Sequence, residues 1–162
     1  MKYFFVVGEA SGDLHASRLM KELLKIDAHA EFMFLGGDKM SRYAGTPLVH
    51  CREMAMMGFV NVLRNIRKIA KIRRVAQQAV LQFVPDRVIL VDYASFNLDF
   101  ARFVKNRLPE TEVDFYIAPK LWASRSWRIS KIRNYVDRMF TILPFETAYF
   151  ARKGFMVDYV GN

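Results

Sequence analysis

Several features are scarce in this sequence, and each absence excludes a class of protein. The 162 residues include one cysteine, Cys51, so no disulfide can form within the chain and a reducing compartment is indicated. No apolar run approaches the roughly 18 residues that a membrane-spanning helix needs. The first residues also lack the basic, apolar and small-residue regions of a signal peptide. We therefore expect a cytoplasmic protein in which Cys51 is structural.

Patterns that bind metals or cofactors are also missing. The histidines at positions 15, 29 and 50 are scattered and show no spacing typical of a metal site. No glycine-rich loop ends in Lys followed by Ser or Thr, which excludes a P-loop. The G-x-G-x-x-G pattern of dinucleotide sites is absent as well. We expect no metal and no cofactor.

The composition is that of one folded domain, 1–162, with an excess of positive charge. Hydrophobic residues make up 52% and aromatic residues 14% of the chain, which argues against disorder. A chain of 162 residues can bury a core of its own. The formal net charge of +9 bears on which partners the protein binds and says little about its fold. On charge alone, nucleic acid, anionic lipid and phosphorylated substrates all remain open.

The first turn of the chain is a candidate binding site. An apolar run, 2–7, leads into Gly8-Glu9-Ala10-Ser11-Gly12-Asp13-Leu14-His15, after which the apolar residues take a helical period. Glycines allow the tight backbone geometry of such a turn, and the first N–H groups of the helix point toward whatever lies above the strand. Ser11 and Asp13 are candidate caps of this helix. A binding turn and an ordinary strand–helix connection remain alternatives of equal weight.

Strands and helices alternate along the whole chain. For this order the economical topology is a parallel sheet with right-handed crossovers. We therefore expect an α/β, Rossmann-like domain with helices on both faces of the sheet. The expected strands lie at 2–7, 31–35, 87–92, 113–117, 137–143 and 156–160.

Polar residues follow several of these strands. Asp92 ends a continuous apolar strand, as is typical of a parallel sheet, and ligands of open α/β sheets bind at the carboxyl edge. We predict that the strands closing at Gly8, Asp92 and Ile117 converge on one cleft. For Asp92 and Asn97, helix capping and loop hydrogen bonding are the alternatives to a binding role.

A long helix from about Phe59 to Phe83 contains cations but no acidic residue. Its apolar residues, Ile66 and Ala70 among them, share one face, and five of its six cations cluster on the opposite face. The basic face can be a solvated surface or a surface that contacts anionic lipid headgroups. Because the helix has no acidic residue with which these cations could pair, lipid contact is favoured. The expected membrane contact comprises Phe59, Arg64, Arg67, Lys68 and Lys71.

The segment from Gly8 to His15 resembles the N-terminal signature of bacterial lipid-A-disaccharide synthases. Further motifs extend the resemblance over essentially the whole chain: Gly36-Gly37, Met57-Gly58 with Val62-Leu63, Phe96-Asn97-Leu98 after Asp92, Ala118-Pro119 with Trp122-Ala123, and Leu143-Pro144-Phe145-Glu146. Three positions depart from the pattern. Asn61 stands where many members have Glu, Ser95 where many have Asp or Gly, and Ser124 where the motif has a second tryptophan.

The resemblance implies an inverting glycosyltransferase of the two-domain GT-B type, peripheral on the cytoplasmic face of the bacterial inner membrane. Such enzymes join UDP-2,3-diacylglucosamine to 2,3-diacylglucosamine 1-phosphate, and their N-terminal half mostly provides the acceptor site. This chain matches that half, so we expect an acceptor-side domain without the C-terminal donor-binding domain and without activity alone.

Within this interpretation, Asp13 and Asp92 are the candidate catalytic residues. The rival hypothesis is a basic, non-enzymatic α/β module that binds an anionic membrane or nucleic acid. No nucleic-acid motif accompanies the charge, so nucleic acid is not an expected partner. The expected substrate-binding residues are Gly8, Glu9, Ser11, Gly12, Met57, Gly58, Asn97 and Trp122.

Overall fold

The computed structural model describes residues 1–54, 62–119 and 128–161. Six strands form one sheet in the order β2-β1-β3-β4-β5-β6, and every neighbouring pair is parallel. The α/β, Rossmann-like architecture expected from the sequence is therefore confirmed. The strands are β1 (Lys2–Val7), β2 (Glu31–Leu35), β3 (Arg87–Val91), β4 (Glu112–Tyr116), β5 (Arg138–Thr141) and β6 (Asp158–Tyr159).

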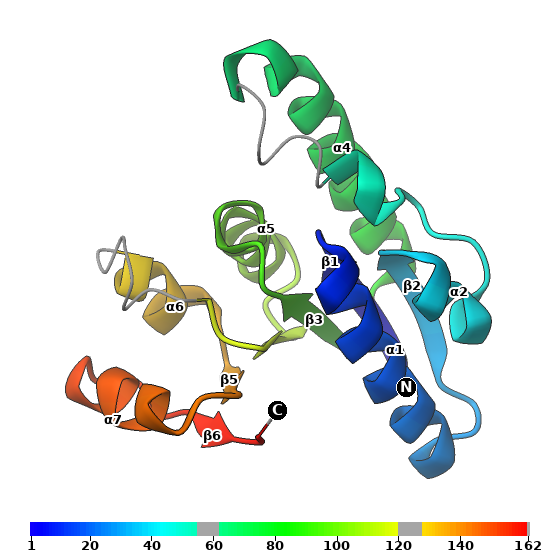
Figure 1. Ribbon diagram of the computed structural model, residues 1–162. Helices are drawn as coiled ribbons and strands as arrows, with labels where there is room; N and C mark the ends of the chain where they lie inside the picture. The colour runs from blue at the N-terminus through cyan, green and yellow to red at the C-terminus, as the bar shows by residue number, and fades with distance from the viewer. Residues whose placement is uncertain (55–61, 120–127, 162) are drawn as a thin grey trace.

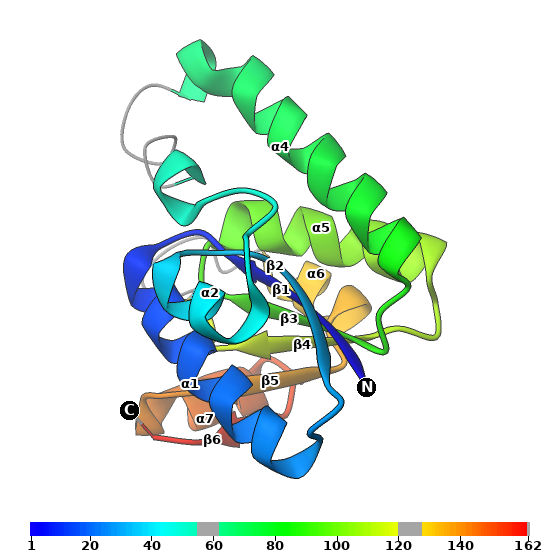
Figure 2. The same ribbon diagram turned by 90° about the vertical axis from the view of Figure 1, so that its right-hand side faces the viewer.

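Helices cover both faces of this sheet, as expected (Figures 1 and 2). Two helices lie on one side, α1 (Ala10–Ile26) and α2 (Asp38–Ala44). The other side carries α4 (Val62–Phe83), α5 (Ala94–Arg107), α6 (Ile129–Tyr135) and α7 (Pro144–Arg152).

Alternate residues of the strands supply two separate cores. In β1, Phe4 and Val6 belong to the core under α4 and α5, whereas Phe5 and Val7 belong to the core under α1 and α2. All four side chains are fully buried. A strand that is buried on both faces reads as a continuous apolar run, which is why the sequence marks β1 so clearly.

The end of the chain is less regular than expected. The expected strand at 156–160 contracts to β6, Asp158–Tyr159, which pairs with β5 alone. Met156, at the start of the expected segment, is 79% exposed. The local apolar composition suggested a longer strand, but an edge strand with one partner receives hydrogen bonds on one side only.

Helix α4 packs against the domain through its second half. Ile72, Ala76 and Val80 are buried in the core, whereas the first turns project beyond the rest of the domain (Figures 1 and 2). Ile66, on the expected apolar face, is 58% exposed. The apolar face of α4 is therefore only partly covered by this domain.

Gly12 allows α1 to lie close against the sheet. A Cβ atom at this position would lie 2.8 Å from Val7 Cγ1 and 3.2 Å from Val91 Cγ1, which belong to two neighbouring strands. Both valines are buried in the core and have little room to move. The glycine thus serves helix–sheet packing, whatever else the turn does.

We predict that Gly12→Ala lowers the free energy of unfolding by about 1 kcal/mol. Overpacking typically costs about 1–3 kcal/mol, which exceeds the gain in helix propensity of at most about 1 kcal/mol. Urea denaturation measures the change. Ser11→Ala, an exposed position of the same helix, is the control and is expected to change stability by less than about 0.5 kcal/mol. A more stable Gly12→Ala variant would contradict the packing argument.

Candidate functional site

The turns after β1, β3 and β4 meet at one edge of the sheet. Val7 pairs with Val91, and Val91 pairs with Tyr116, so the carboxyl ends of the three strands lie side by side. The strands closing at Gly8, Asp92 and Ile117 therefore end at one edge, and their convergence on one cleft stays a prediction. We refer to these three turns together as the carboxyl edge.

The first of these turns is shaped by an aromatic ring. A Cβ atom at Gly8 would lie 2.6 Å from Cγ of Tyr93, so the ring of Tyr93 packs directly over the glycine. Glu9 and Ser11 follow and are exposed. Glu9 is the N-cap of α1, and no side chain caps this helix. The prediction that Ser11 or Asp13 caps α1 is therefore wrong, because both residues lie inside its first turn.

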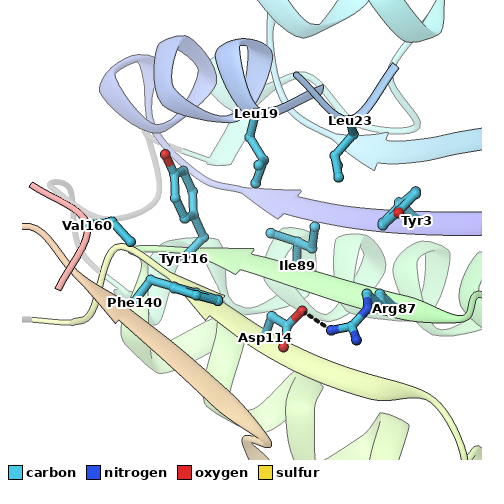
Figure 3. Close-up of a pocket in the computed structure, with 9 residues that line it drawn as sticks. All are labelled: Tyr3, Leu19, Leu23, Arg87, Ile89, Asp114, Tyr116, Phe140 and Val160. Carbon is cyan, nitrogen blue, oxygen red and sulfur yellow. Dashed lines mark hydrogen bonds and ion pairs between the residues drawn. The ribbon is translucent and has the colours of Figure 1, made fainter. Parts of the chain in front are cut away.

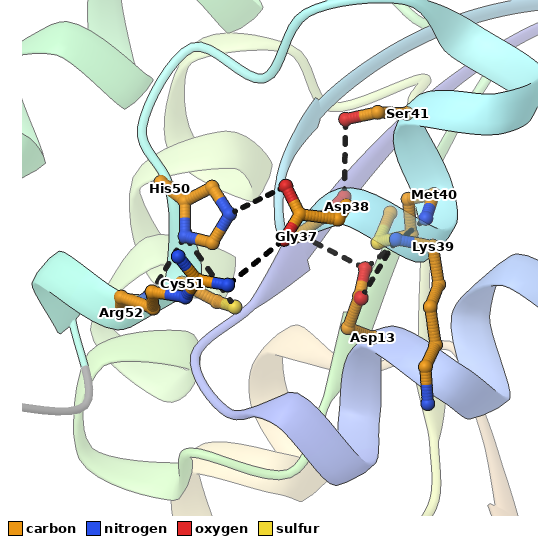
Figure 4. Close-up of polar contacts among 9 residues, drawn as sticks. All are labelled: Asp13, Gly37, Asp38, Lys39, Met40, Ser41, His50, Cys51 and Arg52. Atoms are coloured by element: carbon orange, nitrogen blue, oxygen red, sulfur yellow. Dashed lines mark hydrogen bonds and ion pairs between the residues drawn. The ribbon is translucent and has the colours of Figure 1, made fainter.

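Asp13 instead holds the start of α2 (Figure 4). Its carboxylate accepts hydrogen bonds from the backbone N–H groups of Gly37 at 2.9 Å, Lys39 at 3.0 Å and Met40 at 3.2 Å. A Cβ atom at Gly37 would lie 2.7 Å from Asp13 Oδ2, so the contact requires glycine there. Asp13 is 5% exposed. Asp13 therefore caps the N-terminus of α2, which is a structural role, and its catalytic role stays a prediction.

A small polar cluster surrounds this cap (Figure 4). Asp38 is the first residue of α2, and its carboxylate pairs with Arg52 at 3.0 Å and lies 3.2 Å from His50 Nε2. Burial raises the pKa of the Cys51 thiol, with a further contribution from the charge of Asp13. The thiol is therefore protonated at neutral pH, which agrees with the structural role expected for Cys51.

The turn after β3 is held in a strained conformation. Asp92 and Tyr93 have φ values of 48° and 43°, in the left-handed region that few side chains adopt. The side-chain amide of Asn97 donates to the carbonyl oxygens of Asp92 at 2.8 Å and Val91 at 3.2 Å. Asn97 is fully buried, so it fixes the backbone beneath Asp92. Its direct contact with a substrate stays a prediction.

The third turn is strained as well. Ile117, directly after β4, has a φ of 70°, which is unusual for a β-branched residue. Strained residues of this kind cost about 1–3 kcal/mol each and cluster at functional sites. Sequence inspection does not reveal this signal at Tyr93 and Ile117, because neither residue type favours the left-handed region, whereas Asp92 belongs to a type that is enriched there.

Tyr93 connects two of the turns with the segment that follows α2. Its hydroxyl donates to the carbonyl oxygen of Met54 at 3.4 Å. Burial raises the pKa of this hydroxyl, and the negative charge of nearby Glu9 adds to the effect. Tyr93 is therefore a neutral hydrogen-bond donor at physiological pH. Sequence reasoning did not single it out.

Part of the expected site lies outside the described residues. Met57, Gly58 and Phe59 belong to 55–61, and Trp122 belongs to 120–127. Among the residues that the structure does describe, no group of three His, Cys, Asp or Glu side chains is placed to hold a metal ion.

A cavity of about 310 Å³ lies on the sheet face beside α1 and extends along the strands from Tyr3 and Arg87 to Tyr116 (Figure 3). Its lining is largely apolar, with Leu19 and Leu23 from α1 above Ile89 of the sheet. Within it, Arg87 Nη1 and Asp114 Oδ2 form an ion pair at 2.7 Å. Burial nevertheless raises the pKa of Asp114. None of the expected site residues lines this cavity.

Comparison with known proteins assigns the family. The family model described as lipid-A-disaccharide synthetase matches residues 3–162. The chain belongs to the lipid-A-disaccharide synthetase family. The matched residues include the segment from Gly8 to His15 at the carboxyl edge and the neighbouring turn of Asp92.

Named relatives agree with this assignment. The chain is 37% identical over 161 residues to lipid-A-disaccharide synthase of Geobacter sulfurreducens, covering 99% of this chain and 41% of the relative. It is 36% identical to the synthase of Nitrosococcus oceani, with 97% and 40% covered. The chain thus spans about two fifths of the length of these relatives. Membership of an enzyme family does not favour the non-enzymatic module.

A solved structure shows the same fold. UDP-GlcNAc 2-epimerase from Neisseria meningitidis superimposes with a TM-score of 0.67 at 13% identity, covering 100% of this chain and 46% of the epimerase. At this identity the likeness concerns the fold alone. It agrees with the GT-B type of domain expected for the lipid-A-disaccharide synthetase family.

We predict that Asp13→Ala lowers the free energy of unfolding by about 2–4 kcal/mol, because it removes a helix cap and leaves buried N–H groups without an acceptor. Urea denaturation of the chain measures the loss. Glu9→Gln, at an exposed position without a side-chain cap bond, is the control and is expected to leave stability unchanged. Equal stability of the Asp13→Ala variant would show that the cap of α2 is dispensable.

Proposed function

We propose that this chain is the acceptor-binding domain of a lipid-A-disaccharide synthase and that the carboxyl edge binds the acceptor sugar. The main support is the family match over 3–162, combined with the meeting of the signature turn and the Asp92 turn at one edge. In the proposed enzyme, a donor-binding domain from the remaining length of the relatives supplies UDP-2,3-diacylglucosamine. The acceptor is 2,3-diacylglucosamine 1-phosphate.

In this reaction the acceptor hydroxyl attacks the anomeric carbon of the donor sugar, the bond to UDP breaks, and a base takes the hydroxyl proton. Of the two candidate bases, Asp92 is partly exposed at the edge, whereas Asp13 is buried and accepts three backbone N–H groups. We therefore assign the base to Asp92 and a positioning role to Asp13. The strained backbone of Asp92, held by Asn97, would fix the direction of its carboxylate.

We predict that the chain alone does not form the disaccharide, because the donor-binding part is supplied by the longer protein. A chimera in which residues 1–162 replace the corresponding part of the Geobacter sulfurreducens synthase is expected to form it. Release of UDP and mass spectrometry of the lipid product measure the activity. Turnover by the chain alone, or an inactive but folded chimera, would contradict the proposal.

The same chimera tests the assignment of the base. Asp92→Asn is expected to lower kcat by about 10²–10⁴-fold, the usual contribution of general base catalysis, with little change in stability. Asp13→Asn is the comparison variant, and we expect it to affect the free energy of unfolding more than kcat. The opposite pattern would assign the base to Asp13.

We also propose that the domain docks on the cytoplasmic face of an anionic membrane through the projecting part of α4. In the described ranges, no helix is long and apolar enough to cross a membrane. Exposed Ile66 lies beside exposed Arg67, an arrangement typical of helices that lie in the headgroup region. Both substrates of the proposed reaction are lipids, which a peripheral enzyme reaches from the surface.

The cations of α4 do not contribute equally to this proposal. Lys68 lies 4.0 Å from Glu53, and Arg73 pairs with Asp99 at 3.3 Å. As expected, these cations have no acidic partner within α4 itself. The partners of Lys68 and Arg73, Glu53 and Asp99, belong to other segments of the chain. Arg67 and Lys71 are exposed on α4 and are the strongest candidates for lipid phosphates.

We predict that changing Arg64, Arg67, Lys68 and Lys71 together to Gln abolishes sedimentation with vesicles that contain anionic phosphatidylglycerol. Each cation near such a surface contributes about 1 kcal/mol at low salt, so four correspond to roughly a thousandfold in partition. The matched control changes Lys21, Lys25, Arg152 and Lys153, four exposed cations of other segments. Equal loss in both variants would show that net charge alone, and no particular surface, drives binding.

A further inference from the structure

A groove of about 330 Å³ lies between α4 and α5, which pack against each other (Figure 2). Five residues line it: Arg73 from α4 and, from α5, Asp99, Arg102, Phe103 and Asn106. The positions on α5 recur at the spacing of one helix face. Arg102 lies about two turns along α5 from its first residue, Ala94. The groove is therefore separate from the carboxyl edge, which lies at the start of this helix.

The groove carries a net positive charge. Arg73 pairs with Asp99 at 3.3 Å, and the same carboxylate lies 2.6 Å from Lys131 Nζ. Among residues 1–54, 62–119 and 128–161, no acidic side chain forms an ion pair with Arg102, which is exposed. The segments 55–61 and 120–127 contain no Asp or Glu at all. Three cations thus share one carboxylate around the groove.

The remaining lining residues complement a phosphate ester. The side-chain amide of Asn106 lies one turn beyond Arg102 on the same face of α5, so both groups can reach one ligand. Phe103 is partly buried and adds an aromatic surface, with the guanidinium of Arg107 at 6.0 Å from its ring centroid. Guanidinium forks bind phosphate oxygens in a bidentate manner, and an aromatic ring packs against the carbon atoms of an ester.

Exposed cations connect this groove with the projecting part of α4. Arg67, Lys71 and Arg74 are all exposed and follow one another at helical spacing, so they form one row along the helix. The row runs from the projecting part of α4 to the level of Arg73, which lines the groove. Because a soluble phosphate needs no such row beside its site, this continuity favours a ligand that belongs to an anionic surface.

We propose that the groove binds the headgroup phosphate of an anionic phospholipid and thereby fixes the orientation of the domain on the membrane. This inference rests on the proposed docking through α4. The exposed row attracts the surface over about 10 Å, the screening distance at moderate salt. The groove adds recognition of a single headgroup, because Arg102 and Asn106 of α5 and Arg73 of α4 approach the same phosphate from two helices.

Nuclear magnetic resonance titration with monomeric dihexanoylphosphatidylglycerol tests the site. We expect saturable shifts of the Nε–Hε signals of Arg73 and Arg102 and of the side-chain amide of Asn106. Dihexanoylphosphatidylcholine has the same acyl chains but a zwitterionic headgroup, and is expected to cause no saturable shift of these signals. Equal shifts with both lipids would mean that the acyl chains drive binding, and would overturn the headgroup site.

Variants of Arg102 test the contribution of its charge. Arg102→Gln is expected to weaken binding of dihexanoylphosphatidylglycerol roughly tenfold, the usual effect of losing a charged hydrogen bond. Arg102→Lys keeps the charge and is expected to bind within about threefold of the unchanged chain. Arg42→Gln removes an exposed cation from α2, on the other face of the sheet, and is the matched control. Equal losses in Arg102→Gln and Arg42→Gln, or equally weak binding by Arg102→Lys and Arg102→Gln, would overturn the site.

Sedimentation with phosphatidylglycerol vesicles separates this site from the docking proposal. Arg102→Gln is expected to reduce vesicle binding more than Arg42→Gln does. Vesicle binding that Arg102→Gln leaves unchanged would overturn the groove and leave docking through α4 intact. Saturable shifts without any vesicle binding would refute docking and leave the headgroup site intact. Inorganic phosphate that binds as tightly as dihexanoylphosphatidylglycerol would overturn the assignment to a phospholipid.

Discussion

The arrangement of the carboxyl edge depends on how closely α1 lies against the sheet. Gly12 permits this approach, since any side chain there would meet Val7 and Val91. At the next position, Asp13 reaches across to the N–H groups at the start of α2. One turn of helix therefore fixes the position of two helices relative to the strands, and the exposed residues Glu9 and Ser11 are presented at the edge as a consequence.

The neighbouring turns rely on buried polar contacts rather than on glycine. Asn97 holds the carbonyl oxygens of Val91 and Asp92 from below, and the ring of Tyr93 packs over Gly8 from the next strand. These contacts offset the cost of left-handed backbone at Asp92 and Tyr93. The rigid turns thus present partly exposed Asp92 at the carboxyl edge.

Charge is distributed unevenly over the domain. Arg73 and Lys131, in α4 and α6, share one carboxylate partner, Asp99. Arg67 lies further along the projecting part of α4 and is exposed. The proposed attraction to a lipid surface therefore depends mainly on the exposed cations of the projecting part of α4 and not on the paired ones.

The sequence alone determined the parallel, Rossmann-like class of the domain, the family, and the edge where the candidate residues meet, because apolar periodicity and contiguous motifs are local signals. It did not determine which residues do structural work there. Asp13 caps α2 rather than its own helix, and Lys68 and Arg73 find their partners in Glu53 and Asp99. Such contacts join residues that are more than ten positions apart, so only the tertiary structure brings the groups within hydrogen-bonding distance.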